Sequence, residues 1–327
     1  MRAFLLLIFS CALLPAAANA QAADRPPEWA FPVTPPGFKP QPDDGNPRQV
    51  ANSSVKYSLA QTRDRFFTPD WHPADHRPMP PIVATGRKPG VFACGFCHRA
   101  DGSGGPENAS LAGLSAGYIR QQMADFKSGV RTTSVPERGP PQLMIALAKA
   151  ASDEEIRASA EYFAALKPRM TIKVVETETV PKTYVAGLYL ADAGTGESEP
   201  LGRRIIEVPE DLAQFENRDT RTRFIAYVPV GSLQRGKDLV AKGVGGGGTQ
   251  CAGCHGPGLG GVSDIPPIAG RSPSYAVRQF HDFKSGARAG AGSELMKPVV
   301  EKMTLDDMIA LAAYAASLPP DGGLPNK

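Results

Sequence analysis

Two short motifs constrain this chain more than any other part of its sequence. Residues 94–98 read Cys-Gly-Phe-Cys-His and residues 251–255 read Cys-Ala-Gly-Cys-His. In the spacing C-x-x-C-H, two thiols can form thioethers with the vinyl groups of one haem, and the next imidazole can reach the iron. We therefore predict two covalently attached haem c groups, with His98 and His255 as axial iron ligands. The attaching cysteines are Cys94, Cys97, Cys251 and Cys254.

A cysteine pair of this spacing would also fit a zinc site or a redox-active dithiol. The cysteine count argues against both. The sequence has 5 cysteines, and the fifth, Cys11, lies in an N-terminal segment that we expect to be removed. All remaining cysteines then belong to the two motifs. A lipoprotein signal cleaved at Cys11 is the alternative for that residue.

The first twenty residues have the pattern of a secretory signal peptide. Arg2 precedes an apolar run over residues 4–14, and residues 18–20 read Ala-Asn-Ala, a small-residue cleavage site. We expect the mature chain to begin near Gln21 in the periplasm, where haem c is attached. No later stretch approaches the ~20 apolar residues of a membrane span. Peripheral association with a membrane remains open.

The formal net charge is +3, and it falls to +2 when Arg2 is removed with the signal peptide. So small a charge gives no indication of nucleic-acid binding.

The two motifs lie in an internal repeat. An offset of 157 residues, from Cys94 to Cys251, also superimposes residues 125–129 on residues 282–286, and both read Asp-Phe-Lys-Ser-Gly. Self-similarity without gaps over this distance indicates two copies of one domain.

Capping residues predict the helices of each copy. Ser115 and Ser272 are suited to begin a helix that ends at Gly129 or Gly286, respectively. The capping boxes Ser152–Glu155 and Thr304–Asp307 precede a final helix in each copy. These final helices are predicted over residues 156–166 and 308–318.

The fold class predicted from these elements is mainly α, with two haem domains in tandem. The predicted segments are a signal peptide at 1–20, a Pro-rich arm at 21–91, a first haem domain at 92–168, a β-rich connecting segment at 169–231 and a second haem domain at 232–327.

The two segments outside the repeat have their own predictions. The arm should cover a domain surface, since Trp29, Phe31 and Phe38 need burial. The second domain has a predicted helix at 233–242, opened by Ser232, that the first lacks, and we hypothesise that the arm fills that place. The connecting segment should form a small antiparallel element. Its strands are predicted at 171–177, 183–190, 204–208 and 223–228.

Matched methionines predict the sixth iron ligands. Met144 lies eight residues before Ser152, and Met296 lies eight before Thr304. A thioether is a soft, neutral ligand that favours ferrous iron and raises the reduction potential. The other methionines lack such a match and are predicted to serve other roles, mostly in the core.

Two histidines in the arm have an open role. His72 and His76 are four residues apart, but the prolines beside them argue against a shared helix. We expect structural roles for both, with a distal haem ligand as the alternative.

The repeated residues resemble tandem class I cytochromes c of the dihaem cytochrome c4 type, over about 94–168 and 232–319. The resemblance implies two all-α haem domains, His/Met-ligated iron and electron transfer. It also implies that a backbone carbonyl, at Ser110 and Pro267, orients each proximal histidine. The arm and the β-rich segment depart from the family.

We therefore expect a periplasmic electron carrier rather than an enzyme. It would pass electrons from a respiratory donor, such as a quinol-oxidising complex or a dehydrogenase, to a terminal oxidase or reductase. A dedicated cytochrome subunit of a periplasmic dehydrogenase is the first alternative. A dihaem peroxidase is the second, and it would need one iron with an open or displaceable position.

Overall fold

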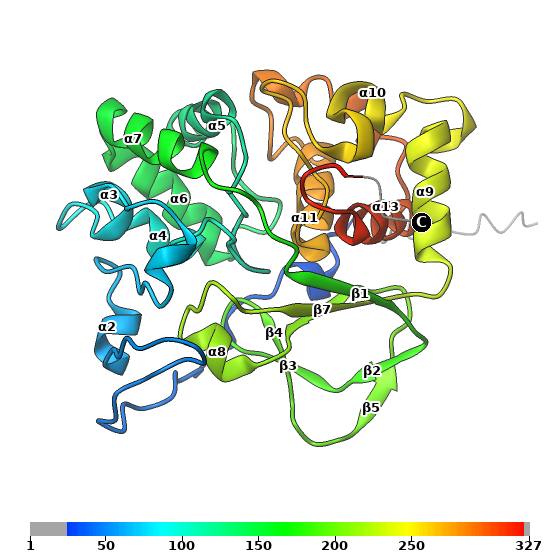
Figure 1. Ribbon diagram of the computed structural model, residues 1–327. Coiled ribbons are helices and arrows are strands. Elements are labelled where there is room, and N and C mark those ends of the chain that lie inside the picture. Colours follow the sequence, from blue (N-terminus) through cyan, green and yellow to red (C-terminus); the bar gives the residue numbers. More distant parts are fainter. Residues whose placement is uncertain (1–24, 324–327) are drawn as a thin grey trace, which may run out of the picture.

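The computed structural model describes residues 25–323, so the predicted signal peptide lies outside the described residues. Two helical bodies lie side by side above a layer of strands (Figure 1). The first contains α4 (Cys94–His98), α5 (Ala116–Ser128), α6 (Gly139–Ala150) and α7 (Asp153–Ala164), and α3 (Pro81–Ala84), near the end of the arm, packs on α7. The second contains α9 (Ser232–Lys242), α10 (Cys251–His255), α11 (Pro273–Lys284), α12 (Lys297–Val300) and α13 (Leu305–Ser317). Among the described residues, no helix is long and apolar enough to cross a membrane.

The helix starts predicted from capping residues are confirmed. The Ser115 and Ser272 hydroxyls accept hydrogen bonds from the third residue beyond them, as an N-cap should. Both capping boxes form, with Ser152 and Glu155 before α7, and Thr304 and Asp307 before α13. For α9 the prediction is off by one position, because Gly231 is the N-cap, in a left-handed conformation, and Ser232 is the first helical residue.

The repeat is present in three dimensions. In the first body the Gly113 amide donates to the Phe163 carbonyl over 3.2 Å, and in the second the Gly270 amide donates to the Ala315 carbonyl over 2.8 Å. These bonds fix the loop after each C-x-x-C-H helix to the final helix of the same body. The two copies therefore share internal contacts as well as sequence.

The two bodies meet about an approximate two-fold axis. The Thr132 amide donates to the Ala287 carbonyl over 2.6 Å, and the Ala289 amide donates to the Val130 carbonyl over 2.8 Å. The 157-residue offset relates the two bonds to each other, because Thr132 corresponds to Ala289 and Val130 corresponds to Ala287. Each copy therefore contributes the same short segment to the contact. This symmetry makes the interface isologous, as in a two-fold dimer of separate chains.

The connecting segment is built from short strands beneath the bodies. They are β1 (Ile172–Glu176), β2 (Thr179–Pro181), β3 (Thr183–Val185), β4 (Leu190–Asp192), β5 (Ser198–Pro200), β6 (Ile206–Pro209) and β7 (Phe224–Val228), with α8 (Leu212–Glu216) between β6 and β7. The three-stranded sheet has the order β1-β7-β6, and two antiparallel pairs, β2 with β5 and β3 with β4, form separate two-stranded sheets.

Two predictions about this segment are wrong. The three-stranded sheet is mixed, because β1 pairs with β7 in parallel while β6 pairs with β7 antiparallel. A long connection separates β1 from β7, and that length is what a parallel pair requires. The strand predicted at 183–190 is two strands, since the chain turns at Gly187, whose φ is 79°.

The arm packs against both bodies. It carries α2 (Leu59–Arg63) and the short 3₁₀ turns Glu28–Ala30 and Pro73–Asp75. Ala30 and Phe31 lie in the core of the second body, whereas Phe38 is 41% exposed, so the burial predicted for Phe38 is wrong. Phe38 lies against Gly187 of the β3–β4 turn instead.

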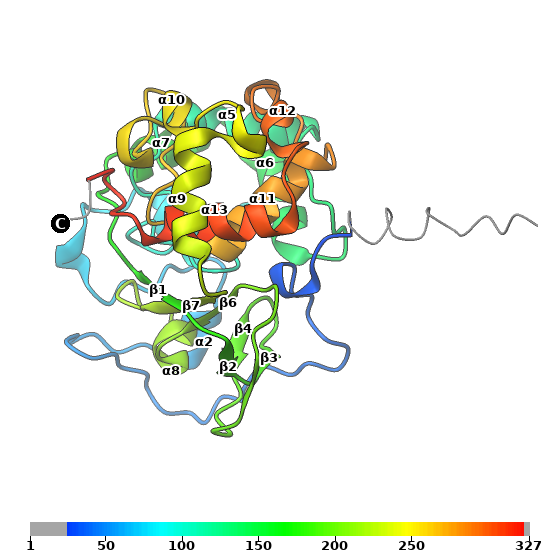
Figure 2. The same ribbon diagram turned by 90° about the vertical axis from the view of Figure 1, so that its right-hand side faces the viewer.

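The arm also contacts the first body, as hypothesised. The Ala93 amide of the first body donates to the Arg65 carbonyl of the arm over 2.9 Å. The four-residue α3 packs on α7, whereas the eleven-residue α9 packs across α13 in the second body (Figure 2). The arm therefore supplies part of the wall that α9 supplies in the other copy.

Candidate haem-binding sites

Both C-x-x-C-H motifs fold as short helices that hold the histidine in the same way. His98 Nδ1 lies 2.8 Å from the Ala109 carbonyl oxygen, and His255 Nδ1 lies 2.8 Å from the Pro266 carbonyl oxygen. A protonated Nδ1 that donates to a carbonyl leaves Nε2 free to bind a metal and fixes the direction of the ring. Each imidazole is therefore prepared for an axial position on iron.

The resemblance placed this carbonyl one residue too late in both copies, at Ser110 and Pro267. The residues involved are Ala109 and Pro266. Every residue type, proline included, has a backbone carbonyl. The side chains at these positions therefore gave no signal by which the register could be corrected.

Burial keeps the two imidazoles neutral. His98 and His255 are both buried, and this burial lowers the pKa of each below its usual value. The hydrogen bonds to Ala109 and Pro266 oppose the shift without cancelling it. A neutral imidazole is the form that binds a metal.

The cysteines do not have the properties of a reactive dithiol. Burial raises the pKa of Cys94 to about 12, and it also raises the pKa of Cys97 and of Cys251. A redox-active pair needs a thiol whose pKa is lowered. Among the described residues, no group of three or more His, Cys, Asp or Glu side chains is placed to hold a metal ion. Conversion to neutral thioethers suits these surroundings.

The predicted methionine ligands lie in different local structures. Met144 lies within α6, and Met296 directly precedes α12 and packs against the core that also contacts Cys251. Both side chains are half-buried. Two of the unmatched methionines, Met303 and Met308, are 2% and 1% exposed in the second core, as a core role predicts, whereas Met170 is 45% exposed. The assignment of Met144 and Met296 to iron stays a prediction.

The histidines of the arm are held by carboxylates. His72 Nε2 lies 3.0 Å from Asp219 Oδ1, with both side chains almost fully buried. His76 Nε2 lies 3.1 Å from Asp70 Oδ1, and its Nδ1 lies 3.1 Å from the Tyr162 hydroxyl. Both ring nitrogens of His76 are engaged within the protein, and a carboxylate lies against Nε2 of His72, which favours the structural role over distal ligation.

Sequence reasoning missed a pair of buried arginines at the two-fold axis. Arg131 donates to Tyr275 Oη over 3.1 Å, and Arg288 donates to Tyr118 Oη over 2.7 Å, so each arginine reaches the tyrosine of the other copy. Their remaining acceptors are the amides Gln122 and Gln279. Both arginines follow the repeated pentapeptide by two positions, and the 157-residue register could have revealed them.

This pair fits an anionic group. Arg131 and Arg288 are each 8% exposed, and neither forms an ion pair with a carboxylate of the described residues. Burial and the neighbouring Arg288 lower the pKa of Arg131. At Arg288, burial is outweighed by Tyr118 and Tyr275, which raise its pKa. Buried charges are normally compensated by a counter-charge. The propionate carboxylates of a haem would supply it, so these residues fit the group that the C-x-x-C-H motifs imply.

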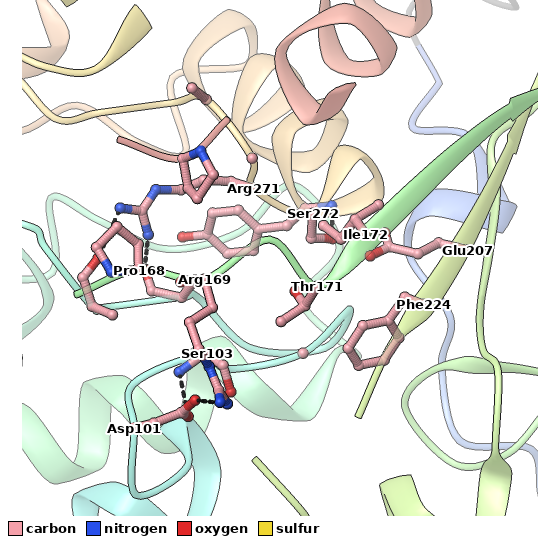
Figure 3. A pocket seen from close by; sticks show the side chains of 17 residues that line it. Asp101, Ser103, Pro168, Arg169, Thr171, Ile172, Glu207, Phe224, Arg271 and Ser272 are labelled. Carbon is pink, nitrogen blue, oxygen red and sulfur yellow. Dashed lines mark hydrogen bonds and ion pairs between the residues drawn. The ribbon is translucent and has the colours of Figure 1, made fainter. Parts of the chain in front are cut away.

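A small cavity lies at the junction of the two bodies and β1 (Figure 3). Arg169 bridges to Asp101 over 2.7 Å on one side of it. On the other side, Arg271 of the second body donates to the Ser110 and Ala112 carbonyls of the first over 2.7 and 3.0 Å. The cavity measures about 40 Å³, which is room for a few water molecules and too small for a substrate. It is part of the seam between the bodies.

Comparison with known proteins agrees with this site. The sequence profile of the cytochrome c family matches residues 233–319, which include the second C-x-x-C-H motif. The "Thiosulfate dehydrogenase electron acceptor" of Stutzerimonas stutzeri is 27% identical over 71% of this chain and 82% of its own length. The "Cytochrome c4" of Pseudomonas aeruginosa is 26% identical over 69% and 83%. The "Cytochrome c-554(548)" of Halomonas halodenitrificans is 31% identical over 20% of this chain and 82% of its own length.

The chain belongs to the class I cytochromes c, a family of electron-transfer proteins with covalently bound haem c. Within that family it is similar to cytochrome c4 over about 69% of its own length. It is a cytochrome c4-like cytochrome, extended by the arm and the connecting segment.

Proposed function

We propose that the protein carries two haem c groups and passes single electrons between a redox donor and an acceptor in the periplasm. One observation supports this most directly. Both C-x-x-C-H helices hold their histidine through Nδ1 on a carbonyl eleven residues later, at the same distance of 2.8 Å. Two sites built alike are suited to bind the same group.

Each bound haem would supply a one-electron couple between ferric and ferrous iron. The chain would attach the two groups through Cys94 and Cys97, and through Cys251 and Cys254. His98 and His255 would bind the iron on one side, and Met144 and Met296 on the other. Arg131 and Arg288 would neutralise propionates at the seam. Two soft, neutral methionine ligands favour electron transfer over chemistry at an open iron.

The donor is proposed to be a dehydrogenase. A relative that is 27% identical over 82% of its own length is named as a thiosulfate dehydrogenase electron acceptor, which supports a partner of this kind. A free carrier would meet the dehydrogenase transiently, whereas a dedicated subunit would copurify with it. The arm and the connecting segment, which lie outside the repeat, would then form its interface.

The haem count tests the proposal. The intact mass of the exported protein should exceed that of the mature polypeptide by two haem groups, and N-terminal sequencing should begin near Gln21. The double variants Cys94→Ser/Cys97→Ser and Cys251→Ser/Cys254→Ser should each retain one haem. A wild-type mass with one haem or none would contradict the proposal, whether or not the variants fold. Peroxide turnover after half-reduction would favour the peroxidase alternative.

A further inference from the structure

The two C-x-x-C-H helices have opposite surroundings. In α4, Gly95 and Phe96 are buried between the two cysteines, whereas in α10 the matching Ala252 and Gly253 are exposed. The second cysteine follows the same contrast, because Cys97 is half-buried and Cys254 is exposed. The repeat therefore preserves the motif but not its access to solvent.

The arm covers one side of α4. A Cβ atom placed on Gly95 would lie 2.6 Å from Thr68 Cγ2 and 3.1 Å from the Val83 carbonyl oxygen. Thr68 is itself 3% exposed and donates to that carbonyl over 2.7 Å. A methyl group at this point would overlap the Thr68 side chain, so the arm packs tightly against this side of α4.

The connecting segment covers the other side of α4. The guanidinium of Arg218, which follows α8, lies 3.6 Å from the ring centre of Phe96 and donates to the Phe96 carbonyl over 2.9 Å. Arg99 stacks on Phe215 of α8, with 4.9 Å between the guanidinium and the ring centre. In Figure 1, α4 faces α2 and α8, while α10 lies at the outer rim of the second body.

The chain segment that carries α10 is partly exposed and has no charged side chain. A Cβ atom on Gly253 would meet nothing within 4 Å. Residues 243–263 contain no Asp, Glu, Lys or Arg, and Val262 is 51% exposed within this stretch. An uncharged surface offers no complement to a strongly charged partner, and it suits a partner whose own contact patch is apolar and neutral.

We propose that redox proteins exchange electrons with this cytochrome at α10, and that the α4 corner is closed to them. The inference rests on the proposed function, in which each cysteine sulfur is bonded to a porphyrin. The exposure of a cysteine then marks how closely a partner can approach that porphyrin corner. The partner is a one-electron redox protein with an uncharged contact patch.

In one exchange the donor protein loses one electron and is oxidised, and one ferric iron becomes ferrous. No proton moves and no bond forms. Electrons destined for the iron at His98 enter at α10 and cross the seam between the bodies. The first site is thus filled and emptied through the second.

Accessibility is tested on the ferric wild-type protein without any turnover. A soluble gadolinium chelate broadens the NMR resonances of exposed groups. The haem-methyl resonances assigned to the Cys251–Cys254 pair, through contacts with the cysteine β-protons, should broaden at lower chelate concentration than those of the Cys94–Cys97 pair. Equal broadening of both sets would overturn the proposal.

Exchange is tested by stopped-flow reduction with reduced flavodoxin, a protein-sized one-electron donor. Gly253→Gln adds bulk at the open position, and Gly253→Glu adds bulk and charge. Both variants should slow the reduction of both haems, seen as the whole absorbance change, and Gly253→Glu should slow it by about tenfold or more. Ala213→Glu places the same charge on exposed α8, on the closed side, and should leave the rate unchanged.

The outcomes separate this inference from the proposed function. If half of the absorbance change in Gly253→Glu occurs at the wild-type rate, electrons reach one haem through a second entrance, and the inference is overturned. So would slowing by Ala213→Glu as large as that by Gly253→Glu. Dithionite, a small reductant, should reduce all variants at rates within about twofold of the wild type. A protein with fewer than two haem groups would instead overturn the proposed function.

Discussion

At the scale of single residues, the two predicted methionine ligands can be removed one at a time. Met144→Ala and Met296→Ala should each abolish about half of the thioether-to-ferric-iron charge-transfer band, because each removes one of two sulfur ligands. The potential of the affected site should fall, since a thioether stabilises ferrous iron. Absorption spectra of the oxidised variants and a redox titration measure both effects.

Met170→Ala is the matched control for these variants. Its side chain is 45% exposed and lies between the first body and β1, so its loss should change neither the band nor the potentials. An unchanged band in Met144→Ala would show that another group occupies that position on the iron. Met144→Ala tests the ligand assignment more stringently than Met296→Ala does, because Met144 lies half-buried inside a regular helix.

Residue roles were predictable from sequence where they depend on near neighbours. The cysteines and histidines share a five-residue motif, and N-caps bond within three residues. The partner of His72 is Asp219, which is 147 positions away along the chain, and no local pattern could indicate it. Arg131 and Arg288 lie between these cases, because the repeat marks them as equivalent but only the fold shows that they are buried together.

At the scale of elements, the attachment of the arm should depend on pH through His76. Burial opposes the charge on this imidazole, but the hydrogen bonds to Asp70 and to the Arg77 carbonyl outweigh it and raise its pKa above 6.5. A raised pKa in the folded state means that the protonated ring stabilises the fold below about 6.5, and that this contribution is lost as pH rises through the folded pKa. Limited proteolysis of the arm should therefore accelerate between mildly acidic and mildly alkaline pH.

His76→Gln is the control for this dependence. The variant keeps a hydrogen-bonding side chain beside Asp70 but has no charge to lose, so its proteolysis rate should show a weaker pH dependence than that of the wild type. The protease's own pH profile is corrected with an unstructured peptide. An identical pH dependence in the two proteins would contradict the assignment to His76.

Because the arm packs closely on α4, substitutions at Gly95 and at the matching Ala252 should differ in how much they destabilise the protein. Gly95→Ala forces a methyl group against Thr68 and should destabilise the protein by about 1–3 kcal/mol, which is typical of overpacking. Ala252→Gly, at the matching exposed position of α10, should cost no more than about 1 kcal/mol. Thermal unfolding of the two haem-loaded variants compares them, and equal losses would contradict the packing described for the arm.

Helices were predicted better than strands because helix signals are local. The N-caps and capping boxes lie within a few residues of the helices they begin. The pairing of β1 with β7 joins residues 172–176 to residues 224–228, and its parallel direction follows from the path between them. Composition could indicate strands there, but it carried no information about their direction.

At the scale of the whole molecule, the repeat predicted two domains but not how the segments outside it join them. The arm contributes Phe31 to the second core and covers α4 in the first body, so it spans both. The connecting segment does the same, because Glu207 of β6 accepts from Ser272 and Ser274 at the start of α11 while Arg218 covers Phe96. These contacts join positions far apart in sequence, and no periodic pattern records them.

Joined in this way, the two bodies should unfold together, and Arg271 is the residue whose loss should weaken that coupling most directly. Its guanidinium donates to the Ser110 and Ala112 carbonyls across the seam, and burial lowers the pKa of Arg271 to about 10. Arg271→Met keeps most of the side-chain length but removes both bonds, which should cost about 2–4 kcal/mol because charged donors form the stronger hydrogen bonds. In scanning calorimetry the single transition should move to lower temperature and broaden or divide.

Arg203→Met provides the comparison, because Arg203 pairs with Asp306 over 2.7 Å while the two side chains are 66% and 50% exposed. An exposed ion pair contributes less than about 1 kcal/mol, so this variant should unfold almost as the wild type does. If the two variants lose equal stability, the seam contributes no more than a surface contact. A wild-type protein that already unfolds in two steps would show that the arm and the connecting segment do not couple the bodies. Coupling of this kind is what an electron path across the seam requires, since both bodies must keep one relative position while partners bind at only one of them.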